Sequence, residues 1–266
     1  MTVAEALRLG EQQLAEAGID TPRVDAELLL AHVLGVSRTG VYAQAEVEVP
    51  GTYQILLGRR LRREPLAYVL GEWGFRRLVL KTDVRALVPR PETEIVVERC
   101  LELLRDEPAP RVLDVGTGTG AIALALADEH RGARVTGIDA SLRALSLAQE
   151  NAELLRLDSR VEMRPGDIGV AAAGWDLVVS NPPYVAPDEW DALQPEIREW
   201  EPREALVGVG LHERIAGIAK TRFLVLEVHE CQAQDVAATL ASLGYTDVRV
   251  TPDLTGKPRV VEGRRP

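Results

Sequence analysis

The stretch Asp114-Val115-Gly116-Thr117-Gly118-Thr119-Gly120 lies between a predicted strand, 111–115, and a predicted helix, 121–129. Glycines at such a junction permit a tight turn and let the backbone approach a ligand closely, with the amides at the helix start pointing toward it. We therefore predict a nucleotide-like ligand. Gly116, Gly118 and Ala121 also satisfy the dinucleotide pattern G-x-G-x-x-G/A, so the glycines alone do not distinguish NAD from S-adenosylmethionine.

Strands and helices alternate around this turn. Further strands are predicted at 133–138, 160–163, 175–180, 223–228, 246–250 and 259–262, and further helices at 142–155 and 232–243. This order is typical of a mostly parallel sheet with helices on both faces. The fold class is therefore α/β, with a doubly wound sheet of seven strands.

The amino-terminal part of the chain has a different pattern. Apolar residues recur at helical spacing over 3–17, a second helix is predicted to open with Thr21 as N-cap and Pro22 in its first turn, and a third covers 53–63. Two short strands, 72–75 and 78–81, predict a hairpin. We therefore expect a helical domain at 1–70, a β-hairpin linker at 71–88 and the α/β domain at 89–266, with a helix from Thr93 to Leu104.

An arginine cluster, Arg59-Arg60-Leu61-Arg62-Arg63, lies on the last of these amino-terminal helices. It offers enough positive charge to dock an acidic partner surface, but a solvated helix face is the commoner reason for such a run. We therefore predict that these arginines face solvent.

Composition limits the classes of function. Hydrophobic residues make up 46% and charged residues 27% of the 266 residues, as in ordinary globular proteins, and the formal net charge is −10. That charge opposes a large contact with a nucleic-acid backbone, which needs clustered lysine and arginine. Cys100 and Cys231 form no metal-binding pattern, and we find neither a basic and apolar leader nor a run of 18 apolar residues. We expect a cytoplasmic, soluble monomer that binds no metal, membrane or nucleic acid.

A second stretch, Val178-Val179-Ser180-Asn181-Pro182-Pro183-Tyr184, predicts a buried parallel strand that must end at Asn181, because two prolines cannot continue a sheet ladder. The prolines stiffen the loop, so the side chain of Asn181 and the carbonyl of Pro182 can point the same way. Two acceptors beside an aromatic ring suit a planar substrate that carries an NH2 group. An ordinary strand-ending turn is the simpler alternative.

Acidic residues follow the other predicted strands. Asp139 ends the second strand about twenty residues after the glycines, where a carboxylate accepts hydrogen bonds from ribose hydroxyls. Asp167 follows the third strand, where it can meet an adenine amino group while Ile168 packs on the ring. Taken singly, each acid is more simply a loop or capping residue. Together with Asn181 they lie where a doubly wound sheet binds its ligands.

The sequence closely resembles the release-factor glutamine N5-methyltransferases, the HemK-like family, over nearly its whole length. The resemblance rests on Arg90-Pro91-Glu92-Thr93-Glu94, the glycine turn, Asp139, Asp167, Asn181-Pro182-Pro183-Tyr184 and Glu201-Pro202. It implies a methyltransferase fold, S-adenosylmethionine as methyl donor, and the glutamine of the Gly-Gly-Gln loop of peptide-chain release factors as acceptor. It also makes the helical domain a substrate-recognition domain.

The resemblance assigns roles to particular residues. It places Asn181, Pro182 and Tyr184 at the chemistry, and it implies a substrate site made by Asn181, Pro182, Pro183, Tyr184 and Glu201. The implied cofactor site comprises Gly116, Thr117, Gly118, Thr119, Gly120, Asp139, Asp167, Ile168 and Asn181. The chain departs from the family after Leu206, where one helix is predicted to be shortened, and after Glu227, where Val228-His229 replaces an expected glycine.

Four alternatives remain open from the sequence. A ribosomal-protein glutamine methyltransferase shares every motif, and a nucleic-acid amino-methyltransferase would present the same planar NH2 group to the same loop. The acidic charge and the lack of a basic insert disfavour nucleic acid. A cofactor-binding module without activity and an NAD oxidoreductase are the alternatives from other classes, and the second gives Asn-Pro-Pro-Tyr no role.

Overall fold

The computed structural model describes residues 1–265 and divides them into two compact units. The helical unit comprises Met1–Glu72 together with Leu193–Trp200, and the α/β unit comprises Trp73–Ala192 and the chain from Glu201 onward. The predicted domain boundaries assign 193–200 to the α/β domain, whereas this segment packs with the amino-terminal helices. No helix in residues 1–265 is long and apolar enough to span a membrane.

The helical unit is built around three helices that share one core. Its elements are α1 (Val3–Glu16), α2 (Pro22–Leu34), α3 (Gly40–Ala43), α4 (Thr52–Leu61), α5 (Leu66–Leu70) and α9 (Pro195–Trp200). Tyr53 is fully buried and donates a hydrogen bond to the carbonyl of Ala6. Gly10 leaves room for that ring, because a Cβ there would lie 2.2 Å from the tyrosine oxygen. Thr21 opens α2 without capping it, since its hydroxyl donates to Asp25 instead.

The prediction that the arginine cluster faces solvent is wrong for Arg60 and Arg63, whereas Arg62 is exposed as predicted. Arg60 is buried and donates to Asp25 at 2.7 Å and to Glu196 of α9 at 2.9 Å. Arg63 donates to the same Glu196 at 2.6 Å. Both carboxylates therefore come from inside the unit, and one arrives more than 130 residues later in the chain.

The α/β unit contains the predicted seven-stranded sheet, in the order β5-β4-β3-β6-β7-β9-β8. The strands are β3 (Arg111–Val115), β4 (Arg134–Asp139), β5 (Val161–Pro165), β6 (Trp175–Ser180), β7 (Thr221–Glu227), β8 (Thr246–Pro252) and β9 (Pro258–Arg264). Strands β3 to β7 pair in parallel, and β9 runs antiparallel between β7 and β8. The prediction of a doubly wound α/β fold is confirmed.

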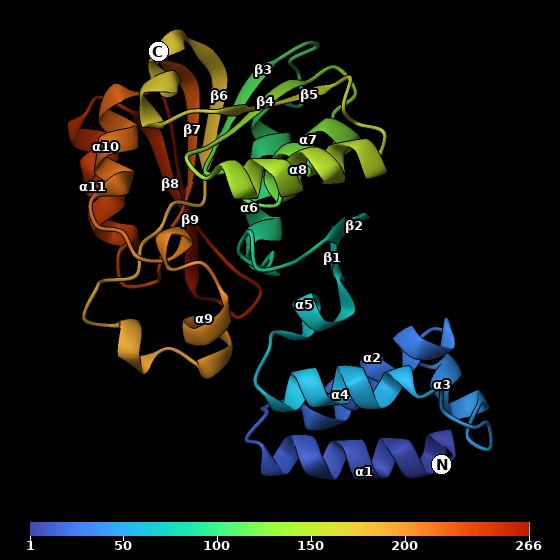
Figure 1. Cartoon of the computed structure of the whole chain (residues 1–266). Coiled ribbons are helices and arrows are strands. Elements are labelled where there is room, and N and C mark those ends of the chain that lie inside the picture. Colours follow the sequence, from blue (N-terminus) through green and yellow to red (C-terminus); the bar gives the residue numbers. More distant parts are fainter. Residues whose placement is uncertain (266) are drawn as a thin grey trace. The chain divides into compact units, whose positions relative to one another are not determined.

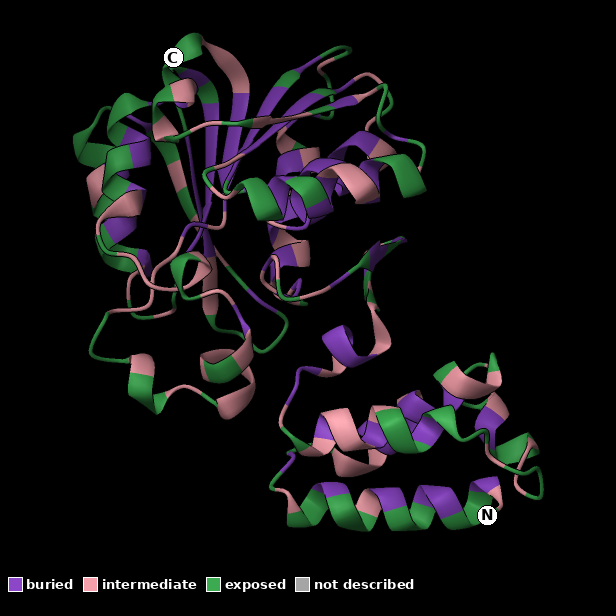
Figure 2. Cartoon of the chain, in the orientation of Figure 1, coloured by how far each residue is buried: buried purple, intermediate pink, exposed green. Residues whose placement is uncertain are grey.

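Helices cover both faces of this sheet (Figure 1). They are α6 (Thr93–Leu103), α7 (Ala121–Glu129), α8 (Leu142–Leu154), α10 (Leu211–Ile218) and α11 (Ala233–Ser242), with 3-10 turns η1 (Ile168–Ala173), η2 (Trp190–Ala192) and η3 (Arg203–Ala205). Alternate residues of the central strands enter two separate cores: Val112 and Val179 pack under α6 and α7, while Leu113 and Val178 pack under α10 and α11. Figure 2 shows the buried strands between the two helical layers.

The hairpin of β1 (Glu72–Phe75) and β2 (Leu78–Lys81) was predicted at its observed residues. The side chain of Asn151 in α8 fixes it, accepting from the Lys81 amide at 2.7 Å and donating to the Lys81 carbonyl at 3.1 Å. After Leu206, where a shortened helix was predicted, the chain forms the eight-residue α10. The sequence reasoning did not predict α3, α5 or α9 as separate helices.

Candidate functional site

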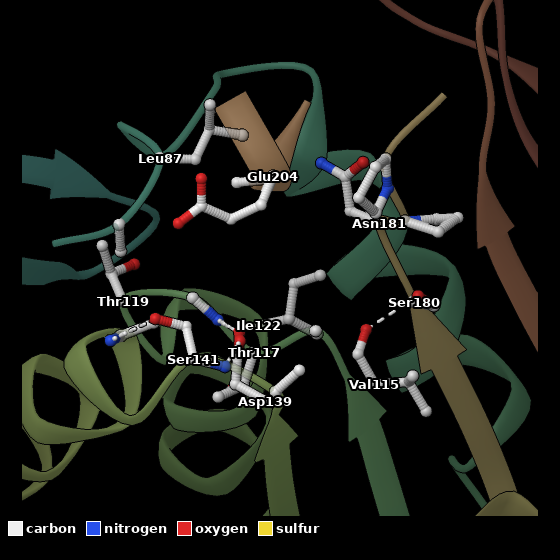
Figure 3. A pocket seen from close by; sticks show the side chains of 18 of the residues that line it. Leu87, Val115, Thr117, Thr119, Ile122, Asp139, Ser141, Ser180, Asn181 and Glu204 are labelled. Atoms are coloured by element: carbon white, nitrogen blue, oxygen red, sulfur yellow. Dashed lines mark hydrogen bonds between the residues drawn. The ribbon is translucent and has the colours of Figure 1, made fainter. Parts of the chain in front are cut away.

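A cavity of about 400 Å³ opens at the carboxyl ends of β3, β4 and β6. Its walls come from the glycine turn, the chain after Asp139, the Asn-Pro-Pro loop and the segment 85–90. Figure 3 shows Asp139, Ser141 and Thr117 on one side of the cavity and Asn181 on another. The volume lies in the range of about 300–1,000 Å³ that small-molecule sites occupy. This is the place where a doubly wound sheet binds ligands.

The glycine turn is shaped for a ligand but not for a phosphate. Gly116 and Gly118 have φ angles of 75° and 56°, and no heavy atom lies within 4 Å of a Cβ built on either. The amides of Gly116 and Thr117 both donate to the carbonyl of Ile138, and the amide of Gly118 donates to Asp139. These three N–H groups are therefore already paired. The amides predicted to point at the ligand are those at the start of α7, which these three bonds do not test, and the turn stays open to close approach.

Asp139 is held with its carboxylate at the cavity wall. Its two oxygens accept from the amide of Gly118 at 3.0 Å and the amide of Ser141 at 2.9 Å. Ser141 then caps α8 by accepting from the amide of Ala144. Two backbone donors fix the carboxylate but leave lone pairs for further donors, because a carboxylate has about four acceptor positions. Asp139 can therefore accept hydrogen bonds from ligand hydroxyls.

Asp114 lies under the turn in a fully buried position. Burial raises its pKa to about 7, and the hydroxyl of Thr117, which donates to Oδ2 at 2.7 Å, opposes that rise. The other oxygen, Oδ1, has no hydrogen-bond partner in the described structure. Leaving one oxygen of a buried carboxyl unpaired is costly, so this end of the sheet is a candidate functional region.

The Asn-Pro-Pro-Tyr loop begins where β6 ends, as predicted. The hydroxyl of Ser180 donates to the carbonyl of Val115 at 2.7 Å and ties this strand end to β3 (Figure 3). The Asn181 amide donates to the hydroxyl of Thr93 at 3.4 Å. Asn181 and Pro182 both line the cavity.

Tyr184 lies farther along the loop, outside the cavity lining. Its ring stacks on His212, with centroids 6.4 Å apart and an angle of 18° between the planes, and lies 6.2 Å from the ring of His229. Its carbonyl accepts from Gln232 at 3.2 Å. Burial raises the pKa of Tyr184 to about 12, so its hydroxyl stays protonated at neutral pH.

The structure brings most of the predicted residues to one cavity. Its lining includes Gly116, Thr117, Gly118, Thr119, Asp139, Asp167, Ile168, Asn181, Pro182 and Pro183. Gly120 is buried instead and packs closely, since a Cβ there would lie 2.9 Å from Leu124. Glu201 is also buried, and its carboxylate binds the amide of Val88 at 3.2 Å and Arg90 at 2.6 Å. Its contact is with the cavity wall, and the predicted substrate contact of Glu201 stays a prediction.

Several lining residues escaped the sequence reasoning. They include the wall segment 85–90, Thr93, Ser141, Glu204 and Arg214. Ser141 carried a usable signal, because a serine two residues after a strand-ending aspartate and before an apolar helix is a typical N-cap. Thr93 lies in a motif that carries the resemblance, but no site role was assigned to it, since its partner Asn181 is 88 residues away.

Two family models match the chain. The PrmC N-terminal domain matches residues 5–71, and the methyltransferase small domain matches residues 94–197. A release factor glutamine methyltransferase of Deinococcus radiodurans is 41% identical, covering 100% of this chain and 99% of the relative. The enzyme of the same name from Caulobacter vibrioides is 38% identical, over 99% of this chain and 96% of the relative.

Solved structures agree with the fold. The catalytic domain of human METTL16 in complex with the MAT2A 3′UTR hairpin 1 superposes with a TM-score of 0.58 at 15% identity, covering 83% of each chain. The N-terminal domain of human METTL16 in complex with SAH gives a TM-score of 0.51 at 14% identity, covering 70% of the present chain and 75% of the METTL16 chain. At such low identity the likeness concerns the methyltransferase fold alone. The near-complete match to curated relatives goes further: the chain belongs to the release factor glutamine methyltransferase family.

Proposed function

We propose that this enzyme transfers a methyl group from S-adenosylmethionine to the side-chain amide nitrogen, N5, of the glutamine in the Gly-Gly-Gln loop of peptide-chain release factors. The observation that carries the proposal is a single cavity that joins the glycine turn and Asp139 to the two acceptors of Asn181 and Pro182. A cofactor bound against the turn would therefore meet a substrate amide held by the loop. Release factors act in the cytoplasm, so we place the enzyme there, acting as a monomer without binding nucleic acid.

The residues present fit this cofactor better than a dinucleotide. Three amides of the glycine turn donate within the protein, which leaves them unavailable to a pyrophosphate, a group that S-adenosylmethionine lacks. Asp139 has lone pairs for the ribose hydroxyls, while Asp167 and Ile168 line the side where the adenine would lie. When bound, the cofactor supplies an activated methyl group on a positively charged sulfur.

The protein's own contribution is to orient a weak nucleophile. An amide nitrogen reacts poorly because its lone pair is delocalised into the carbonyl. In our proposal, Oδ1 of Asn181 and the carbonyl of Pro182 accept hydrogen bonds from the two N–H groups of the glutamine amide, aim the nitrogen, and stabilise the positive charge that grows on these hydrogens. The bond between the methyl group and the sulfur would break as the new N–C bond forms, and the nitrogen would then release one proton to water. Proximity and preorganised acceptors then supply the catalysis, without a strong base or a covalent enzyme intermediate.

The stacked rings give the loop its stiffness. Tyr184 is fixed by His212 on one side and by the hydrogen bond of Gln232 to its carbonyl on the other. We propose that it forms one wall of the glutamine site, with Pro183 beside it, and that its neutral hydroxyl takes no proton in the reaction. The helical unit is proposed to recognise the body of the release factor.

A labelling experiment tests the proposal. The enzyme is incubated with S-adenosylmethionine carrying a labelled methyl group and, separately, with a release factor, the same factor with Gln→Ala in its Gly-Gly-Gln loop, ribosomal protein, and nucleic acid. We expect label only on the intact release factor. Label on the Gln→Ala factor, or on ribosomal protein or nucleic acid alone, would overturn the assignment of this glutamine.

A further inference from the structure

The amide of Asn181 works only in one of its two orientations. A side-chain amide has an acceptor oxygen and a donor nitrogen of nearly the same size, and a half-turn exchanges them. If the NH2 group of Asn181 faced the substrate amine, two donors would oppose each other. Something in the protein must therefore select the orientation in which Oδ1 faces the substrate.

Thr93 is in position to make that selection. It is the first residue of α6, its side chain is only 5% exposed, and its hydroxyl oxygen accepts from Nδ2 of Asn181 at 3.4 Å. Accepting this bond leaves the hydroxyl proton of Thr93 free for another acceptor. A side-chain hydrogen bond with Thr93 also lowers the pKa of Glu227, a carboxyl at the end of β7 that is 1% exposed.

We propose that Thr93 and Glu227 are positioning residues that fix the Asn181 amide with its oxygen toward the substrate, a role that rests on the proposed function. An ionised carboxylate can only accept hydrogen bonds. It therefore draws the hydroxyl proton of Thr93 to itself, and the hydroxyl can then only accept from Asn181. The result is a directed chain in which Asn181 donates to Thr93 and Thr93 donates to Glu227.

Protonation of Glu227 would remove this direction. A protonated carboxyl can donate to the Thr93 oxygen, which frees the hydroxyl to donate to Oδ1 of Asn181 and turns the amide the wrong way. Burial raises the pKa of Glu227 to about 7; Thr93, Arg259 and Arg90 oppose this, and Glu92 adds to it. Tyr184 stays neutral, and Oε2 of Glu227 has no partner within residues 1–265. We therefore expect turnover to rise with pH through about 7.

The test compares Thr93→Val, which removes the hydroxyl at nearly constant shape, with Thr93→Ser, which keeps it. Turnover number and KM are measured with the release factor, and the cofactor dissociation constant is measured by calorimetry. We expect Thr93→Val to lower kcat by about tenfold with cofactor binding unchanged, because the orientation depends on one hydrogen bond in a dry site. Thr93→Ser should restore kcat to within about twofold. Thr136→Val, a buried threonine of β4 outside the cavity, is the matched control.

The pH dependence provides a second readout that a structural role would not move. Wild-type kcat should rise with a single ionisation near pH 7, and Glu227→Gln should give a flat profile, because its amide oxygen accepts from Thr93 at every pH. Wild-type turnover by Thr93→Val, or a rise of equal size in Glu227→Gln, would overturn the inference. If wild-type enzyme failed to methylate the release factor, the proposed function itself would be overturned and this inference with it.

Discussion

Glu27 in the helical unit and Glu227 in the α/β unit are both nearly inaccessible to solvent, 3% and 1% exposed, yet their pKa values are shifted in opposite directions. Tyr42, Arg38 and Arg23 all contact Glu27, and these hydrogen bonds, that from Tyr42 first, lower its pKa to about 2. Glu227 has no ion pair among the described residues, and burial raises its pKa to about 7. The depth of burial and the donors that an acid meets therefore set its charge together.

The contrast extends to whole regions. In the helical unit, Asp25, Glu27, Glu64 and Glu196 each bind an arginine, so their charges serve the fold. At the carboxyl ends of the strands, Asp114 and Glu227 each keep one oxygen without a partner. A protein bears the cost of an unpaired buried group where function requires it, so among the described residues this difference distinguishes the paired acids of the helical unit from two buried acids near the cavity.

The largest expected effect is the loss of turnover when the side-chain amide of Asn181 is removed. Asn181→Ala removes one of the two proposed acceptors and should lower turnover by about 10²–10³-fold. Cofactor binding and the unfolding temperature should stay close to wild type, because the side chain makes one long hydrogen bond to the framework. Steady-state methylation of the release factor measures turnover, and calorimetry measures cofactor binding and the unfolding temperature. Turnover like that of the wild type would exclude Asn181 from the chemistry.

Asp139→Ala should act on the other side of the cavity. It removes the proposed partner of the ribose hydroxyls, and hydrogen bonds to charged groups contribute about 1.5–3 kcal/mol, so we expect cofactor binding to weaken by about tenfold or more. Titration calorimetry with S-adenosylmethionine provides the measurement. Asp167→Ala is a useful variant for comparison, since the carboxylate of Asp167 is exposed and also accepts a hydrogen bond from the amide of Gly169. An unchanged dissociation constant in Asp139→Ala would rule out the ribose contact.

Glu227→Gln should stabilise the protein at alkaline pH, and its turnover should not depend on pH. The folded pKa of about 7 lies above the ordinary value of 4.5, so the folded state loses stability as pH rises from 4.5 to 7. Removing the ionisable group should recover up to about 3 kcal/mol at pH 8 and almost nothing at pH 4. The pKa of Asp114 is raised as well, so part of the loss of stability with rising pH should remain in this variant. Thermal unfolding from pH 4 to 8 tests the sign, and a variant less stable than wild type at pH 8 would contradict it.

Glu27→Gln should show the reverse behaviour. The lowered pKa of Glu27 means that its stabilisation is present above pH 4.5 and disappears as pH falls toward 2. We expect a loss of about 1–2 kcal/mol at pH 7, because Arg23 and Arg38 are half exposed and solvent can take over part of their hydrogen bonding. Denaturant unfolding at pH 7 and pH 3 should show that the difference in unfolding free energy between wild type and Glu27→Gln shrinks on acidification. The kcat of the folded variant should be unchanged. A difference in unfolding free energy that grew on acidification would contradict the lowered pKa of Glu27, and with it the opposite pKa shifts of Glu27 and Glu227.

Much of the α/β unit could be predicted because its signals are local. The strands at 111–115 and 175–180 and the hairpin were placed at their observed residues, since a continuous apolar run fixes a buried strand and two prolines fix its end. The positions of Gly116, Asp139 and Asn181 at one edge followed from the parallel order alone. Strand-end residues share an edge in any doubly wound sheet.

What escaped prediction depends on partners far apart in the chain. The environment of Arg60 depends on Glu196, and that of Asn181 on Thr93. The ring of Tyr184 meets His212, which lies on α10. No local periodicity carries such pairings. The arginine cluster was therefore interpreted as exposed, although its acids were present elsewhere in the sequence.

The buried arginine between Asp25 and Glu196 has a consequence for how the protein is made. A ribosome delivers Arg60 early and Glu196 136 residues later. At about 5–20 residues per second this interval is on the order of 10 s. During that time the nascent helices must hold Arg60 with Asp25 and the carbonyl of Glu64, and α9 completes them only when most of the α/β chain has emerged. The helical unit is thus begun first on the ribosome and finished late.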